Sequence, residues 1–107
     1  MYEVYIFDID GTLTGKSRQV TPKTVEAIRQ ARANGNKVFL CTGRAPVSIM
    51  KSIRNIGFDG VISSAGSFIE IDGQYICENF INQYLLQEVI LLFTNANVLY
   101  TLETKDC

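Results

Sequence analysis

Uninterrupted runs of apolar residues in the first half of the chain predict buried strands. Residues 4–9 form one run, broken only by Asp8, and residues 37–41 form another. A strand that is apolar on both of its sides is typical of a parallel sheet, because helices cover both faces of such a sheet. The short run at residues 61–62 predicts a third strand of the same kind.

Two segments between these strands carry the signals of helices. Thr21-Pro22 combines an N-cap residue with a proline in the first turn, and Asn34-Gly35 supplies the stop. A second helix is expected to begin at Pro46 and to end at Gly57, because its apolar residues fall on one face. Strand, helix, strand, helix, strand with short loops is a βαβαβ unit, which predicts an α/β fold with a parallel sheet.

The pattern changes in the second half of the chain. Residues 68–71 and 74–77 read as strands on either side of Asp72-Gly73, and this dipeptide is a strong signal for a two-residue hairpin turn. A helix from residue 82 to about 96 follows, and residues 98–102 read as one more strand.

The bulk properties are those of one small domain or part of a larger one. The chain has 107 residues, of which 47% are apolar and 20% charged, as in ordinary globular proteins. The formal net charge is −1, and no block of basic residues indicates a nucleic acid or a membrane surface as a partner. The most apolar window, residues 89–93, is far too short to span a bilayer.

The sequence contains no histidine, which excludes Ser-His-Asp and Cys-His catalysis and every zinc site built on histidine. Its three cysteines are widely spaced and include no CxxC pair, as is typical of reduced thiols in the cytosol. Met1 leads directly into the first strand pattern without a signal-type segment. We therefore expect a cytoplasmic protein.

Asp8 and Asp10 stand at the end of the first apolar run and are followed by Gly11-Thr12. Two carboxylates at positions i and i+2 of a strand point to the same side and repel each other unless a cation lies between them. Mg²⁺ suits this position, since it prefers carboxylate, water and phosphate oxygens. A polar turn explains Asp10 and Gly11, but it leaves unexplained an acid at position 8 within an apolar strand. The segment therefore indicates a metal site that handles phosphate.

Thr42-Gly43-Arg44 follows the second predicted strand, and Ser63 to Ser67 follows the third. Ligands of open α/β sheets bind at the carboxyl ends of the strands, so these loops and Asp8 are expected at the same edge. Thr42 and Gly43 offer a hydroxyl and an N–H to a phosphoryl group. Two interpretations remain open for Arg44, which either reaches a substrate anion or pairs with a surface acid. The 63–67 segment is equally a third loop of the site or a simple turn of small residues.

These motifs resemble those of the haloacid dehalogenase superfamily of phosphohydrolases, and most of all its Cof-type branch. The resemblance rests on the segment from Phe7 to Thr14, on Thr42-Gly43-Arg44, on the spacing between them, and on the hairpin. It implies a Rossmann-like, three-layer α/β core with a parallel sheet. Residues 1–80 would then be the N-terminal half of that core with its hairpin, and residues 81–107 the beginning of an α/β cap domain.

The resemblance also implies a mechanism, namely Mg²⁺-dependent hydrolysis of a small phosphorylated metabolite through an aspartyl-phosphate. Asp8 would be the nucleophile and Asp10 the general acid and base. The metal would be held by Asp8 and by Asp10 through its main-chain carbonyl. Thr12, Thr42 and Gly43 would bind the phosphoryl group, and Arg44 the rest of the substrate.

Two motifs of the family are missing from this sequence, a lysine motif and a second acidic loop that follow the cap. We therefore expect a truncated piece of a longer enzyme, with weak or no activity by itself. The outer edge of the Asp8 strand would be bare, and the helix around residues 89–93 would expose an apolar patch. The alternative hypothesis is a non-catalytic α/β module that forms homo-oligomers through the open sheet edge.

Overall fold

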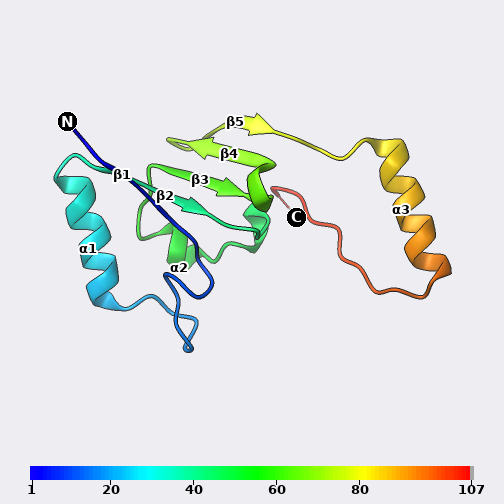
Figure 1. Cartoon of the computed structure of the whole chain (residues 1–107), viewed down its shortest axis with the longest axis horizontal. Coiled ribbons are helices and arrows are strands. Elements are labelled where there is room, and N and C mark those ends of the chain that lie inside the picture. The colour runs from blue at the N-terminus through cyan, green and yellow to red at the C-terminus, as the bar shows by residue number, and fades with distance from the viewer. Residues whose placement is uncertain (107) are drawn as a thin grey trace.

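The computed structural model describes residues 1–106 and contains one five-stranded sheet with the strand order β1-β2-β3-β4-β5 (Figure 1). Strands β1, β2 and β3 run parallel, whereas β4 and β5 are antiparallel to their neighbours. The strands are β1 (Val4–Phe7), β2 (Lys37–Cys41), β3 (Gly60–Ser63), β4 (Phe68–Ile71) and β5 (Gln74–Glu78). The helices are α1 (Pro22–Ala33), α2 (Lys51–Arg54) and α3 (Gln83–Asn95), with 3₁₀ turns η1 (Pro46–Ser48) and η2 (Ser64–Gly66). The predicted α/β fold is confirmed.

Local signals in the sequence account for the helix α1 and for the hairpin. The Thr21 hydroxyl oxygen accepts the N–H of Thr24, so it caps the first turn of α1 as its position predicts. Between β4 and β5, Asp72 and Gly73 both have positive φ angles, of 51° and 78°. Such a pair of left-handed residues matches the twist of a tight hairpin, which is why Asp-Gly is favoured there.

One apolar core joins the sheet to both crossover helices. Val38 and Leu40 of β2 are fully buried and point to the same face of the sheet, because they are two positions apart. Ile28 of α1 and Ile53 of α2 belong to the same buried cluster. The helices α1 and α2 therefore lie on the same face, and residues 1–106 supply two of the three expected layers.

Strand β1 differs from the predicted buried strand in length and in exposure. It ends at Phe7 rather than at residue 9, and within residues 1–106 it pairs only with β2. Its side chains Val4 and Ile6 are 53% and 59% exposed. The prediction of a fully buried strand was wrong, whereas the predicted bare outer edge of this strand is present. The reason is that Val4 and Ile6 alternate with Tyr5 and Phe7, which face α1, and so point to the opposite face of the sheet, which neither α1 nor α2 covers.

Two other predicted elements differ from the structure. The helix expected over 46–57 is divided into η1 and α2, because Ile49 and Met50 have extended backbone with ψ near 120° and 141°. This break allows the side chain of Ile49 to enter the core. Residues 98–102 form no strand, since no neighbouring strand is in register with them in the described region. An extended segment without a ladder partner has no sheet hydrogen bonds to hold it.

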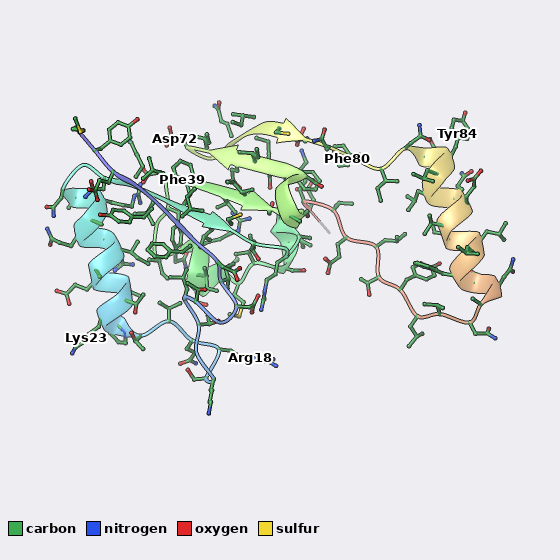
Figure 2. All side chains as sticks on the ribbon, in the orientation of Figure 1. Arg18, Lys23, Phe39, Asp72, Phe80 and Tyr84 are labelled. Carbon is green, nitrogen blue, oxygen red and sulfur yellow. The ribbon has the colours of Figure 1, made fainter. Side chains whose placement is uncertain are left out.

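Helix α3 stands apart from the sheet, at the opposite end of the molecule from α1 (Figure 1). The radius of gyration is 16.5 Å, compared with about 13 Å for a compact chain of this size. Tyr84 projects from α3 at a distance from the sheet (Figure 2), and Leu85, Leu91 and Leu92 are also exposed. The predicted apolar patch on this helix is therefore present. No helix within residues 1–106 combines the length and the apolar character needed to cross a membrane.

The chain returns from α3 to the body of the molecule and contacts it through charged side chains. The Ser48 hydroxyl donates to Glu103 over 3.0 Å. Lys105 pairs with Glu78 and lies 5.0 Å from the centre of the Tyr75 ring. The predicted division after residue 80 falls in the extended segment between β5 and α3, where the excursion of the chain away from the sheet begins.

Candidate active site

The loop that carries Asp8 and Asp10 is built around the backbone of Ile9. The Ile9 side chain is fully buried, and its carbonyl accepts the N–H groups of Leu13 and Thr14 at 3.1 and 3.0 Å. Gly11, with φ of 81°, allows the sharp reversal that these bonds require. Because Ile9 points inward, the residues on either side of it point out, and both are exposed to solvent.

Strand pairing brings the second predicted loop to the same edge of the sheet. In the parallel register Phe7 is the partner of Leu40, so Asp8 and Thr42 follow the carboxyl ends of adjacent strands. The Thr42 side chain is buried, and its hydroxyl oxygen accepts the N–H of Arg44 over 3.0 Å. Gly43, between them, is exposed at the tip of the turn.

The third loop, residues 63–67, lies at this edge as well and is bonded to the second. The Ser64 N–H donates to the Arg44 carbonyl over 2.7 Å, and the Ala65 N–H donates to the Thr42 carbonyl over 3.1 Å. Ser64 and Ala65 both have left-handed φ angles, of 47° and 54°. Non-glycine residues adopt this conformation at a cost that the surrounding structure must offset. The structure places this segment at the rim, and its residues 64–66 form the 3₁₀ turn η2.

Arg44 makes a bidentate ion pair with Asp10. Its Nη2 lies 2.7 Å from Asp10 Oδ1 and its Nε lies 2.9 Å from Asp10 Oδ2. The Arg44 hydrogen bond lowers the pKa of Asp10 below its ordinary value, and the same bond raises the pKa of Arg44. Sequence reasoning named both residues but did not pair them, since they are 34 positions apart and only the sheet brings them together.

Two rim residues were missed by the sequence analysis. The carbonyl of Ser48 accepts Arg44 Nη1 over 3.2 Å, and its hydroxyl donates to Glu103. A serine and a glutamate in segments without a motif give no signal in the sequence. Their proximity follows from the path of the chain after α3.

The donor set at the rim fits a magnesium ion. Within residues 1–106 no group of three or more His, Cys, Asp or Glu side chains is placed to hold a metal. Mg²⁺ does not require such a cage, because it is usually bound by one or two carboxylates together with waters and substrate phosphate oxygens. Asp8 is exposed at the rim, with Oδ1 accepting the N–H of Ile9 over 2.9 Å, and it can supply one such carboxylate. The carboxylate of Asp10 is engaged by Arg44, so Asp10 is left to contribute its main-chain carbonyl.

Comparison with known proteins identifies the family of this chain. The sequence profile of haloacid dehalogenase-like hydrolases matches residues 5–107, which is nearly the whole chain. The chain belongs to the haloacid dehalogenase-like hydrolases. The predicted family is therefore confirmed.

Individual haloacid dehalogenase-like relatives carry phosphatase names. The chain is 28% identical over 105 residues to the putative phosphatase YxeH of Bacillus subtilis, a match that covers 98% of the chain and 37% of the relative. It is 33% identical over 101 residues to a phosphoglycolate phosphatase of Picrophilus torridus, covering 94% and 39%. The chain thus spans less than two fifths of the length of these relatives.

A solved structure supports the same assignment at the level of the fold. The phosphatase BT1666 of Bacteroides thetaiotaomicron, described as a member of the same enzyme superfamily, superposes with a TM-score of 0.76 at 26% identity. The superposition covers 91% of this chain and 37% of that one. The haloacid dehalogenase-like core of this chain is therefore shared with an enzyme of known structure.

Proposed function

We propose that this chain carries the nucleophile-bearing rim of a Mg²⁺-dependent phosphohydrolase that acts on a small phosphorylated metabolite. The observation that carries the proposal is the meeting of three loops at one sheet edge, with Asp8 and Asp10 on the first and Thr42 on the second. The phosphoglycolate phosphatase name of one relative supports a small metabolite as the substrate.

Asp8 and Asp10 have different roles in the proposed hydrolysis. An Asp8 carboxylate oxygen forms a bond to phosphorus while the bond from phosphorus to the leaving oxygen breaks, which leaves an aspartyl-phosphate on Asp8. Asp10 gives a proton to the leaving oxygen and later takes one from the water that cleaves the aspartyl-phosphate. Asp8 and the main-chain carbonyl of Asp10 would hold Mg²⁺, which when bound would neutralise charge on the phosphoryl oxygens.

Binding of the phosphoryl group falls to the loops around these acids. The Thr42 hydroxyl oxygen accepts the N–H of Arg44, so its own hydrogen is left to donate to a phosphoryl oxygen. Gly43 lies exposed at the tip of the same loop and offers its N–H, and Thr12 offers a hydroxyl from the first loop. Phosphate-monoester hydrolysis needs up to ~10²¹-fold acceleration, which relies on accumulated positive charge around the phosphoryl group. Because this chain lacks the lysine motif of the family, we expect its turnover to be low.

The test is hydrolysis of p-nitrophenyl phosphate by the purified chain, with and without Mg²⁺, beside the variant Asp8→Asn. Asp72→Asn is the matched control, because it makes the same isosteric change of charge at the hairpin turn, where Asn tolerates the left-handed backbone. Activity that needs Mg²⁺ and Asp8 but not Asp72 supports the proposal. Equal activity in the wild-type chain and in Asp8→Asn, or no activity in either, contradicts it for this chain.

A second candidate function is favoured by the outer edge of β1. This edge presents backbone groups that have no strand partner in the described residues, and such an edge is a template for pairing with another strand. Val4 and Ile6 are exposed on a face of the sheet beside it. A non-catalytic module would use it to pair with a second copy of the chain. Sedimentation of the wild-type chain beside Ile6→Lys distinguishes the cases. A dimer that the substitution dissociates favours the module, and a monomer in both contradicts it.

A further inference from the structure

Arg44 is attached to all three loops of the rim. Its guanidinium takes both carboxylate oxygens of Asp10 on the first loop, at 2.7 and 2.9 Å. The remaining terminal nitrogen, Nη1, donates to the carbonyl of Ser48, 3.2 Å away. All three nitrogens of the guanidinium group thus make a hydrogen bond.

The backbone of Arg44 is held as well. Its N–H donates to the buried hydroxyl oxygen of Thr42, and its carbonyl accepts the N–H of Ser64. These two bonds fix the backbone of Arg44, and the bond to Ser48 holds its guanidinium at a point other than Asp10. The Asp10 side chain, in contrast, is 56% exposed. In this pair the arginine is the fixed partner, and the carboxylate takes its orientation from it.

We propose that Arg44 is a positioning residue: a bond from Arg44 to one oxygen fixes the orientation of the Asp10 carboxyl, while the other oxygen, released from Arg44, carries the proton for the leaving group. This assignment rests on the proposed function and replaces the direct contact with a substrate anion that the sequence suggested. An arginine whose Nε and Nη2 already clamp a carboxylate cannot offer that pair of donors to a phosphate. Lysine is a poor replacement, because its ammonium group is a point charge and cannot fix the plane of a carboxylate.

The effect of the leaving group on kcat distinguishes a role of Arg44 in positioning Asp10 from a role in binding the substrate. A p-nitrophenolate departs without a proton, whereas the alkoxide of glycerol 2-phosphate needs one from a correctly placed acid. We expect Arg44→Met to lower kcat for glycerol 2-phosphate ~10- to 100-fold, which is part of the ~10²–10⁴ that a positioned acid supplies. For p-nitrophenyl phosphate we expect Arg44→Met to lower kcat by less than ~3-fold. KM should be unchanged for both substrates. Arg44→Lys should recover only a small part of the loss.

Arg54→Met is the matched control. Arg54 is also a half-buried arginine on a carboxylate, with Nη1 3.3 Å from Glu70 and Nη2 3.3 Å from the carbonyl of Pro46. It lies on α2 rather than on the rim loops, so its loss should change the two substrates equally or not at all. A higher KM for both substrates in Arg44→Met would overturn the proposal in favour of anion binding. An equal loss of kcat for both substrates would overturn it in favour of a general structural defect.

A measurement without turnover keeps the proposal testable if the wild-type chain hydrolyses neither substrate, a result that would contradict only the proposed function. Three-bond couplings between Hα and Hβ of Asp10, measured by NMR, report whether its side chain keeps one rotamer. We expect unequal couplings in the wild-type chain and in Arg54→Met, and averaged couplings in Arg44→Met. Averaged couplings in the wild-type chain, or unequal couplings that persist in Arg44→Met, would overturn the positioning role.

Discussion

The carboxylate of Asp59 links α1 to the sheet through hydrogen bonds to Arg32 and Val38, and its removal tests the fold. The side chain is 12% exposed and lies in the loop before β3. Its Oδ2 accepts the N–H of Val38 over 2.8 Å and Nε of Arg32 over 3.1 Å, while Oδ1 accepts Nη2 of Arg32 over 3.1 Å. One side chain therefore joins helix α1, strand β2 and the entry to β3.

The cost of two substitutions can be worked from these contacts. Asp59→Asn keeps the shape and one acceptor oxygen but loses the charge, and a hydrogen bond to a charged group contributes ~1 kcal/mol more than a neutral one. Arg32 is 36% exposed, so solvent screens part of its attraction, and we expect a loss of about 1–2 kcal/mol. Asp59→Ala also leaves the N–H of Val38 without its acceptor, which adds ~1–3 kcal/mol to the loss of stability.

The pH dependence follows from the pKa of Asp59. Burial by itself raises this pKa, but the Val38 N–H and the Arg32 guanidinium outweigh burial and lower it below the ordinary value. A carboxyl group whose pKa is lower in the folded state stabilises the fold above the unfolded pKa, about 3.9. That contribution disappears as the pH falls through the folded pKa. The stability gap between wild type and Asp59→Asn should therefore shrink in acid.

Urea denaturation at pH 7 and at a series of lower pH values measures both effects. Glu70→Gln is the control, because Glu70 makes a single 3.3 Å bond to Arg54 and should cost less than ~1 kcal/mol. The reasoning is refuted if Asp59→Asn unfolds at the wild-type urea concentration at pH 7. It is also refuted if the difference in free energy of unfolding between wild type and Asp59→Asn stays constant down to the lowest pH of the series.

Three further substitutions test the packing. Gly60→Ala should lower the free energy of unfolding by ~1–3 kcal/mol, because a Cβ there would lie 2.4 Å from the ring of Phe39 (labelled in Figure 2) and 2.8 Å from the Glu70 carbonyl. Thermal unfolding measures this, and an unchanged melting temperature would contradict the close contact of the ring with β3. Ile53→Ala should cost ~2–5 kcal/mol in urea, because its side chain is 2% exposed. Leu92→Ala, at a position that is 64% exposed on α3, should cost less than ~0.5 kcal/mol, and an equal loss in both would mean that α3 packs against the body.

Local signals in the sequence were enough for the elements whose stability is local. The cap at Thr21 and the Asp72-Gly73 turn form as predicted, since each depends on hydrogen bonds and backbone preferences within a few residues. The predicted helix over 46–57 failed because burial of Ile49 in the core overrides a helical pattern. The predicted strand over 98–102 failed because a strand needs a partner, which no local pattern supplies.

By itself the sequence determined the order of elements, the α/β class and the loops that were expected to carry the site residues. These follow from the period of apolar residues and from residue types at strand ends, which are properties of short segments. Only the tertiary structure decided that Arg44 clamps Asp10 and that Asp59 ties α1 to the sheet. Both contacts join residues more than 25 positions apart. Their energy depends on distances of 2.7 to 3.1 Å, and strand register and helix packing set these distances.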